Sequence, residues 1–232
     1  MKKIILCISV SILFSACAAQ SPLGFRPRTT DKVLVCIRPQ VESSLKRQFK
    51  SAKISYPPKE LALLAFKQEK RMEMWARDDS RGWTYIRQYP IVAASGTPGP
   101  KLSQGDKQVP EGVYGLEYLN PNSDYHLSLK VGYPNVFDRL MAKQEGRKNL
   151  GGDIFIHGGN GSSGCMAVGN PNVESIYTVV ARTGVENVKV IIAPNDIRKN
   201  PIALCEKSQC IKWVQVLYDQ IKQELLAFNK KH

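Results

Sequence analysis

The chain has 232 residues, of which 43% are hydrophobic, and its formal net charge is +13. This length suffices for one domain with a substantial core, and no internal repeat is visible. The basic residues are spread along the chain without a long Lys/Arg run, so the charge indicates a solvated basic surface rather than a concentrated nucleic-acid-binding segment.

Residues 1–16 are typical of an export signal. Lys2 and Lys3 precede the apolar run Ile4–Phe14, which is too short for a permanent membrane span, and small residues follow it. Cleavage before Cys17 would leave that cysteine to be lipidated, whereas the sequence Ala-Cys-Ala around it also fits ordinary secretion. We favour the lipoprotein, because Cys17 has no other evident purpose. Either route predicts an exported, periplasmic protein, anchored to the outer membrane if it is lipidated.

Export also limits the partners. An exported protein rarely meets nucleic acid, so we expect no nucleic-acid partner, and anionic envelope polymers or lipid head groups suit the basic charge better. The membrane would be reached only through a lipid anchor. Residues 17–30, with Pro22, Gly24 and Pro27, predict a tether.

The cysteines are interpreted in the same oxidising context. Cys205 and Cys210 are close enough in sequence to form a local disulfide. Cys36 lies in an apolar run and is expected in the core. Cys165 is then left unpaired in a polar Gly/Ser loop, and a free thiol in a secreted protein points to a function.

Hydrophobic periodicity and the positions of Gly and Pro predict the elements after the tether. Strands are expected at 33–37, 61–66, 72–76, 83–92, 112–118, 126–131, 154–156 and 188–193, of which 61–66 and 72–76 form a hairpin, with helix as the alternative there. Helices are expected at 39–52, 171–182 and 213–228, and a long loop at 96–111. Asn170 or Asn172 is the expected N-cap of the middle helix. The fold class is therefore mixed α/β and β-rich, with peripheral helices.

His157 stands eight residues before Cys165, at the end of the apolar run Ile154–Ile156. A cysteine attacks carbonyls as the thiolate, so it needs a nearby base or cation that lowers its pKa. The loop between the two residues is rich in glycine, which lets the backbone turn tightly and approach a substrate closely. The pattern is typical of a Cys/His nucleophile pair.

A structural histidine beside a turn and a small buried cysteine are the alternative interpretation of the same pair. A metal site is disfavoured, because His126 and His232 are remote and no other His or Cys stands at ligand spacing. We expect neither a metal nor another cofactor.

Three ordered motifs extend the pattern. They are Ile156-His157-Gly158 with Ser162-Ser163-Gly164-Cys165, the segment from Gly99-Pro100-Lys101 to Gly112-Val113-Tyr114, and Gly132-Tyr133-Pro134-Asn135 followed by Asp138-Arg139. Together they resemble the YkuD-type L,D-transpeptidase catalytic domain, and within it the YafK-like branch. The resemblance spans roughly residues 61–195 and rests on the combination of the motifs.

The resemblance implies a YkuD-like β-sandwich or barrel core within residues 31–200, with an N-terminal extension, and leaves 201–232 as a C-terminal helical extension. It implies a two-step acyl transfer on peptidoglycan stem peptides. The thiolate of Cys165 would attack the carbonyl at the L-centre of the third-position diamino acid, and His157 would act as the base. A backbone carbonyl at Gly158 or nearby would hold the other ring nitrogen of His157.

Further roles follow from the same resemblance. The backbone N–H groups of Gly164 and Cys165 are candidates for the oxyanion hole. The loop residues around the nucleophile and the candidates for substrate binding are Gly158, Gly159, Ser162, Ser163, Tyr133 and Lys101. Asp138 and Arg139 are expected to form a structural ion pair.

Two departures from the commoner family pattern affect the predicted reaction. Ser163 stands where those members have a second histidine, and Ala167 stands where they have an arginine that could orient a substrate carboxylate. The interval from His157 to Cys165 is also shorter than in the family members that cross-link peptides. The alternatives are an L,D-carboxypeptidase, an amidase that releases wall-anchored proteins, and a non-catalytic peptidoglycan-binding module.

Overall fold

The computed structural model describes residues 28–37, 39–78, 82–200 and 212–229. The predicted export signal, Cys17 as the lipidation site, and the Cys205–Cys210 pair lie outside these ranges.

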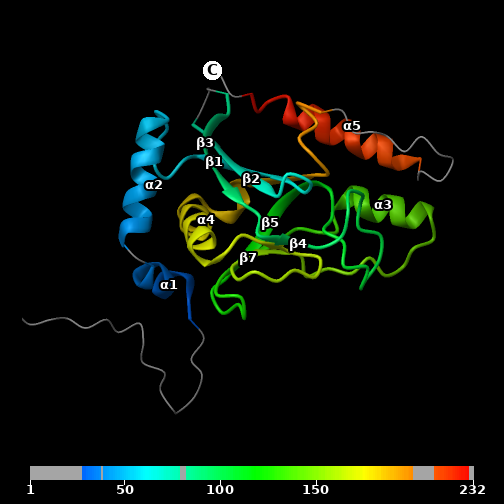
Figure 1. The fold of residues 1–232 in the computed structure, drawn as a ribbon, viewed down its shortest axis with the longest axis horizontal. Coiled ribbons are helices and arrows are strands. Elements are labelled where there is room, and N and C mark those ends of the chain that lie inside the picture. Colours follow the sequence, from blue (N-terminus) through cyan, green and yellow to red (C-terminus); the bar gives the residue numbers. More distant parts are fainter. Residues whose placement is uncertain (1–27, 38, 79–81, 201–211, 230–232) are drawn as a thin grey trace, which may run out of the picture.

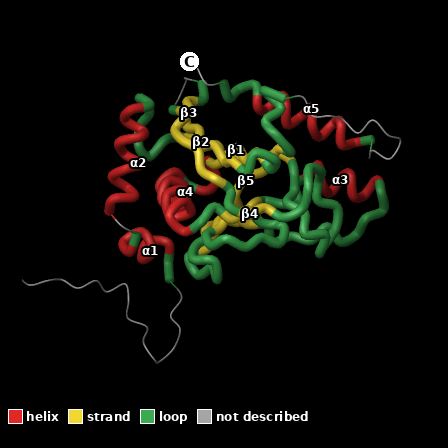
Figure 2. The backbone as a smooth tube through the Cα atoms, viewed as in Figure 1, coloured by secondary structure: helices red, strands yellow, loops and turns green. Residues whose placement is uncertain are grey.

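One mixed sheet forms the centre of the described part of the chain (Figure 2). Its strands are β1 (Glu60–Phe66), β2 (Arg71–Arg77), β3 (Thr84–Pro90), β4 (Ala93–Ala94), β5 (Gly112–Asn120), β6 (Ser128–Val131), β7 (Phe155–His157), β8 (Met166–Ala167) and β9 (Val188–Ala193). Their order is β3-β2-β1-β9-β5-β6-β7-β8-β4. The pairs β1/β9 and β7/β8 are parallel, and the other neighbours are antiparallel.

Helices cover the sheet from outside (Figure 1). They are α1 (Thr30–Cys36), α2 (Pro39–Ser51), α3 (Val136–Gln144), α4 (Asn170–Thr183), the short 3-10 helix η1 (Val185–Asn187) and α5 (Trp213–Leu225). The predicted fold class, a β-rich mixed α/β core with peripheral helices, is confirmed. The sheet curls into a half-barrel.

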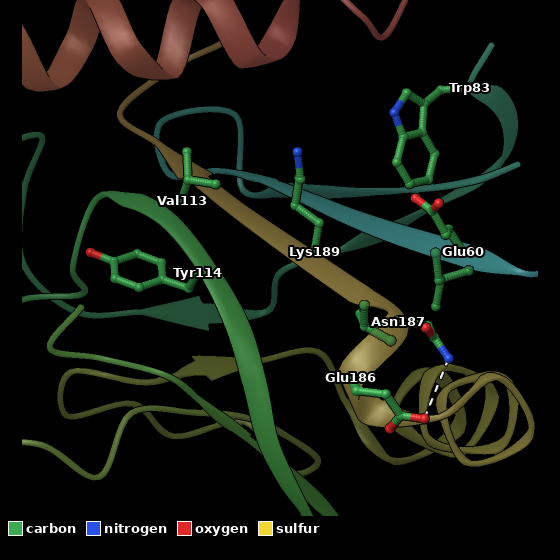
Figure 3. A pocket seen from close by; sticks show the side chains of 9 residues that line it. Glu60, Trp83, Val113, Tyr114, Glu186, Asn187 and Lys189 are labelled. Carbon is green, nitrogen blue, oxygen red and sulfur yellow. Dashed lines mark hydrogen bonds between the residues drawn. The ribbon is translucent and has the colours of Figure 1, made fainter. Parts of the chain in front are cut away.

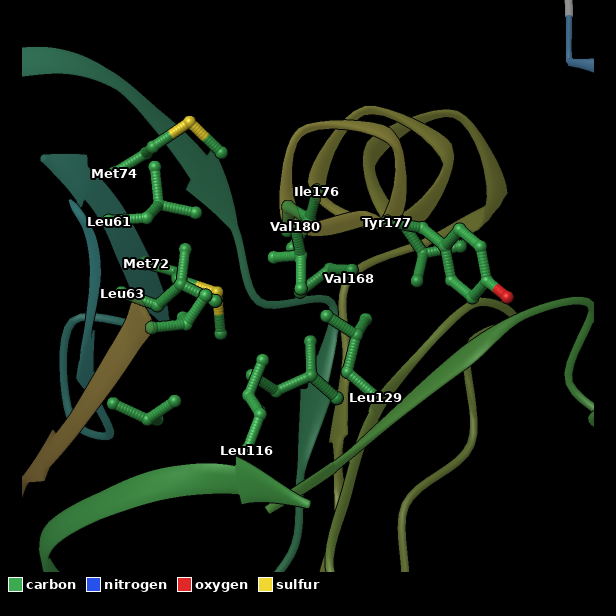
Figure 4. Packing of buried hydrophobic residues seen from close by; sticks show 14 of the residues in the cluster. Leu61, Leu63, Met72, Met74, Leu116, Leu129, Val168, Ile176, Tyr177 and Val180 are labelled. Carbon is green, nitrogen blue, oxygen red and sulfur yellow. The ribbon is translucent and has the colours of Figure 1, made fainter. Parts of the chain in front are cut away.

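Side chains alternate along β1 and so build a core on each face of the sheet. Leu61 and Leu63 point into the larger core, where Ile176 and Val180 of α4 pack against the sheet (Figure 4). Leu64, next to Leu63 in the chain, belongs to the other core, which α5 covers. The hydrophobic run of β1 is continuous because both of its faces are buried.

The predicted strand at 33–37 is wrong: this segment is the helix α1. Thr29 caps it by accepting a hydrogen bond from the N–H of Lys32. Only one face of the run is needed for packing, since Val33 is buried while Val35 is 84% exposed. Cys36 is also exposed rather than in the core, and it is disulfide-bonded.

The other strands and helices that the sequence pattern predicted are present in the structure, with two corrections at helix ends. The N-cap of α4 is Gly169, neither Asn170 nor Asn172, and no side chain caps that helix. Asp138 does not pair with Arg139. It forms a capping box with Asn135 at the start of α3, a helix that the pattern did not predict, and Arg139 is exposed.

Candidate active site

The predicted base and nucleophile line one pocket of about 200 Å³. Ser128 of β6 pairs with His157 of β7, and β8, which begins directly after Cys165, runs parallel to β7. These three short strands therefore bring Cys165 and His157 to the same side of the sheet. The other wall is the polar connection between β5 and β6, whose pocket-lining residues are Asn120, Asn122, Ser123, Asp124 and Tyr125.

The imidazole of His157 is held in one tautomer. Its Nδ1 lies 2.6 Å from the carbonyl oxygen of Gly158. A carbonyl oxygen only accepts, so Nδ1 carries the proton and Nε2 keeps its lone pair. The ring of Tyr125 lies over the imidazole at 4.6 Å between centroids, and burial lowers the pKa of His157. A neutral imidazole with a free Nε2 is the form that a general base requires, and the predicted carbonyl at Gly158 is the one that holds it.

The thiol of Cys165 is half-buried, and its Sγ donates to the carbonyl oxygen of Asp153 at 3.5 Å. Burial raises the pKa of Cys165 above its usual value. This corrects the sequence argument, which expected a neighbour to lower that pKa. The resting pair is therefore a neutral thiol beside a neutral imidazole, and the proton must move when the thiol attacks.

Alkylation of Cys165 tests this protonation state. Because its pKa is raised, the thiolate fraction at neutral pH is smaller than for an exposed thiol, and we expect the iodoacetamide rate to keep rising beyond the pH at which an ordinary cysteine levels off. Intact-protein mass against pH measures the rate, with glutathione as the reference thiol. A plateau at neutral pH would indicate a preformed thiolate instead.

Two serines hold the turn that carries the nucleophile. The Oγ of Ser162 donates to the carbonyl of Cys165 at 2.7 Å and accepts from the N–H of Ser95 at 2.9 Å. The Oγ of Ser95 accepts from the N–H of Gly164 at 2.6 Å. Gly164 has a φ of +91°, which other residues adopt only with strain. Because its N–H is occupied, Gly164 does not serve as an oxyanion-hole donor in this conformation, and the N–H of Cys165 remains as the candidate.

Ser95 had no signal in the sequence, and its removal should act on catalysis. We expect Ser95→Ala to lower kcat by roughly tenfold to a hundredfold, because the turn that aims Cys165 loses its support. Steady-state kinetics and the thermal midpoint measure this, with Ser175→Ala, a partly exposed serine on α4, as the matched control. An unchanged kcat would show that the turn holds its shape without Ser95.

The backbone after His157 leaves no room for a side chain. A Cβ on Gly158 would come within 2.6 Å of both the carbonyl oxygen of Tyr125 and the Oδ1 of Asn170. The same Oδ1 accepts from the N–H of Gly159 at 2.7 Å, which explains why Asn170 does not cap α4. Gly158 and Gly159 thus form a tight backbone turn against Tyr125 and Asn170, and neither glycine is among the residues that line the pocket.

The other predicted substrate residues lie elsewhere. Tyr133 is 2% exposed and donates to the carbonyl of Leu150 at 3.2 Å. Lys101 is buried, and its Nζ donates to the carbonyl of Ser103 at 2.8 Å and pairs with Asp106. Neither side chain lines the pocket with Cys165. The predicted loop residue Ser163 is exposed.

A larger hollow of about 410 Å³ lies where β1, β5 and β9 meet η1 (Figure 3). Glu60, Glu186 and Lys189 line it, but neither His157 nor Cys165 does. Trp83 at its edge packs against Arg77, at 4.7 Å from the guanidinium to the ring, and against Phe228. The smaller pocket is therefore the candidate active site, because it holds the nucleophile and the base.

No group of three or more metal-ligating side chains occurs in the described ranges. Within those same ranges, none of the helices combines the length and the apolar character needed to cross a membrane.

The pocket has the Cys/His chemistry and the surrounding fold that the motifs predict. Residues 62–192 match the family model described as the YkuD L,D-transpeptidase catalytic domain. The chain belongs to this family.

Individual relatives of this YkuD-family chain are distant. It is 31% identical over 134 residues to the protein named "Putative L,D-transpeptidase YafK" of Escherichia coli K12, a match that covers 56% of the chain and 52% of that protein. The chain thus spans about half the length of the curated relatives it matches.

Solved structures with a similar fold include two from other bacteria. The helical cell shape determining protein Pgp2 of Campylobacter jejuni is 25% identical, with a TM-score of 0.48, covering 59% of the chain and 48% of Pgp2. Bd1075 of Bdellovibrio bacteriovorus is 21% identical, with a TM-score of 0.42, covering 61% of the chain and 50% of Bd1075.

Proposed function

We propose that this chain is a cysteine-dependent acyltransferase that acts on peptidoglycan stem peptides. The observation that carries the proposal is the fixed tautomer of His157, which leaves Nε2 without a proton, in a pocket that His157 lines together with Cys165. Family membership supports peptidoglycan as the substrate.

The first step forms a thioester. The sulfur of Cys165 attacks the carbonyl carbon at the L-centre of the third-position diamino acid while Nε2 of His157 takes the thiol proton. The new C–S bond gives a tetrahedral oxyanion. When this oxyanion collapses to the thioester, the C–N bond to the next residue breaks and the imidazolium returns the proton to the leaving amine. The N–H of Cys165 stabilises the oxyanion between these events; one such donor is typically worth about 3 kcal/mol.

The second step resolves the thioester. An amine that attacks it gives transpeptidation or exchange, and His157 takes the proton of that amine. Water in the same place gives a free carboxylate, which is the carboxypeptidase or amidase outcome. The same two side chains perform both reactions, so the acceptor decides the product.

Mass spectrometry of tetrapeptide muropeptides, incubated with the wild-type protein and with Cys165→Ala, tests the proposal. Dimers or D-amino-acid exchange products formed only by the wild type would support transpeptidation, and tripeptides alone would support hydrolysis. Unchanged muropeptides with both proteins would contradict acyl transfer on free stem peptides and leave a wall-anchored protein substrate or a binding module as the alternative.

We place the enzyme outside the cytoplasm, in the periplasm, with Cys17 as a lipidation site at the outer membrane. The charged and apolar pattern of residues 1–16 supports this, and so does the disulfide at Cys36, because disulfides persist mainly in oxidising compartments. Fractionation of cells that produce the full chain, together with the mass of the mature N-terminus, tests both points.

A further inference from the structure

Lys130 is a buried cation beside the pocket that no motif singled out. Along β6, Leu129 and Val131 point into the core, so Ser128 and Lys130 share the opposite face of the strand. Ser128 lines the pocket, and Lys130 is paired in register with Phe155, which lines it too. The Nζ of Lys130 lies 5.0 Å from the centroid of the Phe155 ring. The ammonium group is therefore next to the pocket wall, and the Lys130–Phe155 pair lies two register positions from the Ser128–His157 pair.

One residue connects this cation to the nucleophile. The carboxylate of Asp153 forms an ion pair with Lys130, and the carbonyl oxygen of the same residue accepts the hydrogen bond from the Cys165 thiol. The side chain of Lys130 is 11% exposed, whereas that of Asp153 is 88% exposed. The cation is thus fixed among protein groups, while the anion that balances it is open to solvent. Because the Asp153 carboxylate is exposed, another carboxylate can take its place while the buried ammonium of Lys130 stays paired.

Lys101 is the other lysine whose charge acts on Cys165. It already forms an ion pair with Asp106. Its partner Asp106 accepts hydrogen bonds from the backbone N–H groups of Leu102, Ser103 and Gln108. Removing Asp106 from Lys101 would dismantle that loop. Of these two lysines, only Lys130 pairs with a carboxylate that a substrate carboxylate can replace, namely that of Asp153.

We propose that Lys130 binds the C-terminal carboxylate of the stem peptide, and that Asp153 occupies this position while the pocket is empty. The inference rests on the proposed function. In a stem tetrapeptide, only the amide nitrogen and one α-carbon separate the scissile carbonyl from the terminal carboxylate. When the scissile carbonyl lies at the sulfur of Cys165, the terminal carboxylate therefore lies close to Lys130. Asp153 contacts both groups, Lys130 through its carboxylate and the Cys165 thiol through its backbone carbonyl. Lys130 is a substrate-binding residue that selects peptides with a free terminal carboxylate.

The test compares two substrates that differ in one group: a tetrapeptide with a free C-terminal carboxylate and the same peptide as its C-terminal carboxamide. We expect the wild type to prefer the carboxylate by roughly tenfold to a hundredfold in kcat/KM, the usual effect of a hydrogen bond to a charged group. Lys130→Met should lose that factor on the carboxylate, with little change on the carboxamide. Lys143→Met, an exposed lysine on α3, removes the same charge and should keep the preference.

Asp153→Asn examines the competing anion without removing the backbone carbonyl that contacts Cys165. Because Asn carries no charge that competes with the substrate for Lys130, we expect KM for the carboxylate peptide to fall. Equal losses on both peptides in Lys130→Met, or a wild type that does not distinguish them, would overturn the assignment and show that Lys130 only supports the fold.

A binding measurement separates failure of this inference from failure of the proposed function. Calorimetry of the two peptides with Cys165→Ala, and with Cys165→Ala combined with Lys130→Met, needs no turnover. A carboxylate preference that disappears with Lys130 supports the site even if the wild type transforms neither peptide, in which case the acyl-transfer proposal fails alone. Equal binding of both peptides, or binding of neither, overturns the site whatever the kinetics show.

Discussion

The Cys165→Ala protein should fold normally and form no thioester, and His157→Ala should lose about 10²- to 10⁴-fold in kcat, the usual contribution of a general base. The first change removes the only described free thiol in the pocket. The second removes the Nε2 lone pair that the bond from Nδ1 to the Gly158 carbonyl keeps free. Single-turnover kinetics with muropeptides measure both losses.

His126→Asn is the matched control for His157→Ala. His126 pairs with Glu174 at 2.8 Å, and its φ of +75° is one that asparagine tolerates. We expect this variant to keep nearly full activity. A His157→Ala enzyme that works at the wild-type rate would remove His157 as the base, and a control that fails with it would point to a loss of fold.

The Glu111→Ala protein should be less stable by about 3–5 kcal/mol, because the change leaves a buried ammonium without its counter-charge. Glu111 is fully buried, 3.0 Å from the Nζ of Lys67. It also accepts from the N–H of Gly99 at 2.7 Å and from the hydroxyl of Tyr218 at 2.9 Å. Urea unfolding measures the loss, and Tyr218→Phe should cost only about 1 kcal/mol, the net worth of one hydrogen bond.

Glu117→Ala serves as the control for Glu111→Ala, since Glu117 is an exposed glutamate on the same segment of chain. Lys67→Met combined with Glu111→Leu removes both charges and should recover part of the lost stability. A Glu111→Ala protein within about 1 kcal/mol of the wild type would mean that water or another anion replaces the carboxylate.

Much of the fold could be predicted because burial on both faces of the sheet leaves continuous apolar runs. The hairpin of β1 and β2, the strand β9 and the helix α5 all lie where the pattern placed them. The segment at 33–37 has the same apolar character but packs through Val33 on a helix. Period alone does not separate a short strand from a short helix, and the cap at Thr29 decided the outcome.

The contacts of the candidate site could likewise be predicted only in part. The contact between His157 and the Gly158 carbonyl was predictable because it is local in sequence. Ser95 and Lys130 reach the nucleophile across long separations, through a loop and through strand register, and no single-sequence spacing reports such contacts. Tyr133 was predicted to bind substrate, but its side chain is buried and does not line the pocket. A motif position does not report which way a side chain faces.

The contacts of Glu111 connect α5 to the loop that supports the nucleophile turn. Tyr218 of α5 holds Glu111, Glu111 holds Lys67, and the Nζ of Lys67 donates to the carbonyls of Gly99 and Val109 in the loop that begins at Ser95. Val109 in turn donates its N–H to the carbonyl of Ser95. These hydrogen bonds connect α5 to the loop whose Ser95 accepts from the N–H of Gly164 in the nucleophile turn, so docking of α5 supports that turn from a distance.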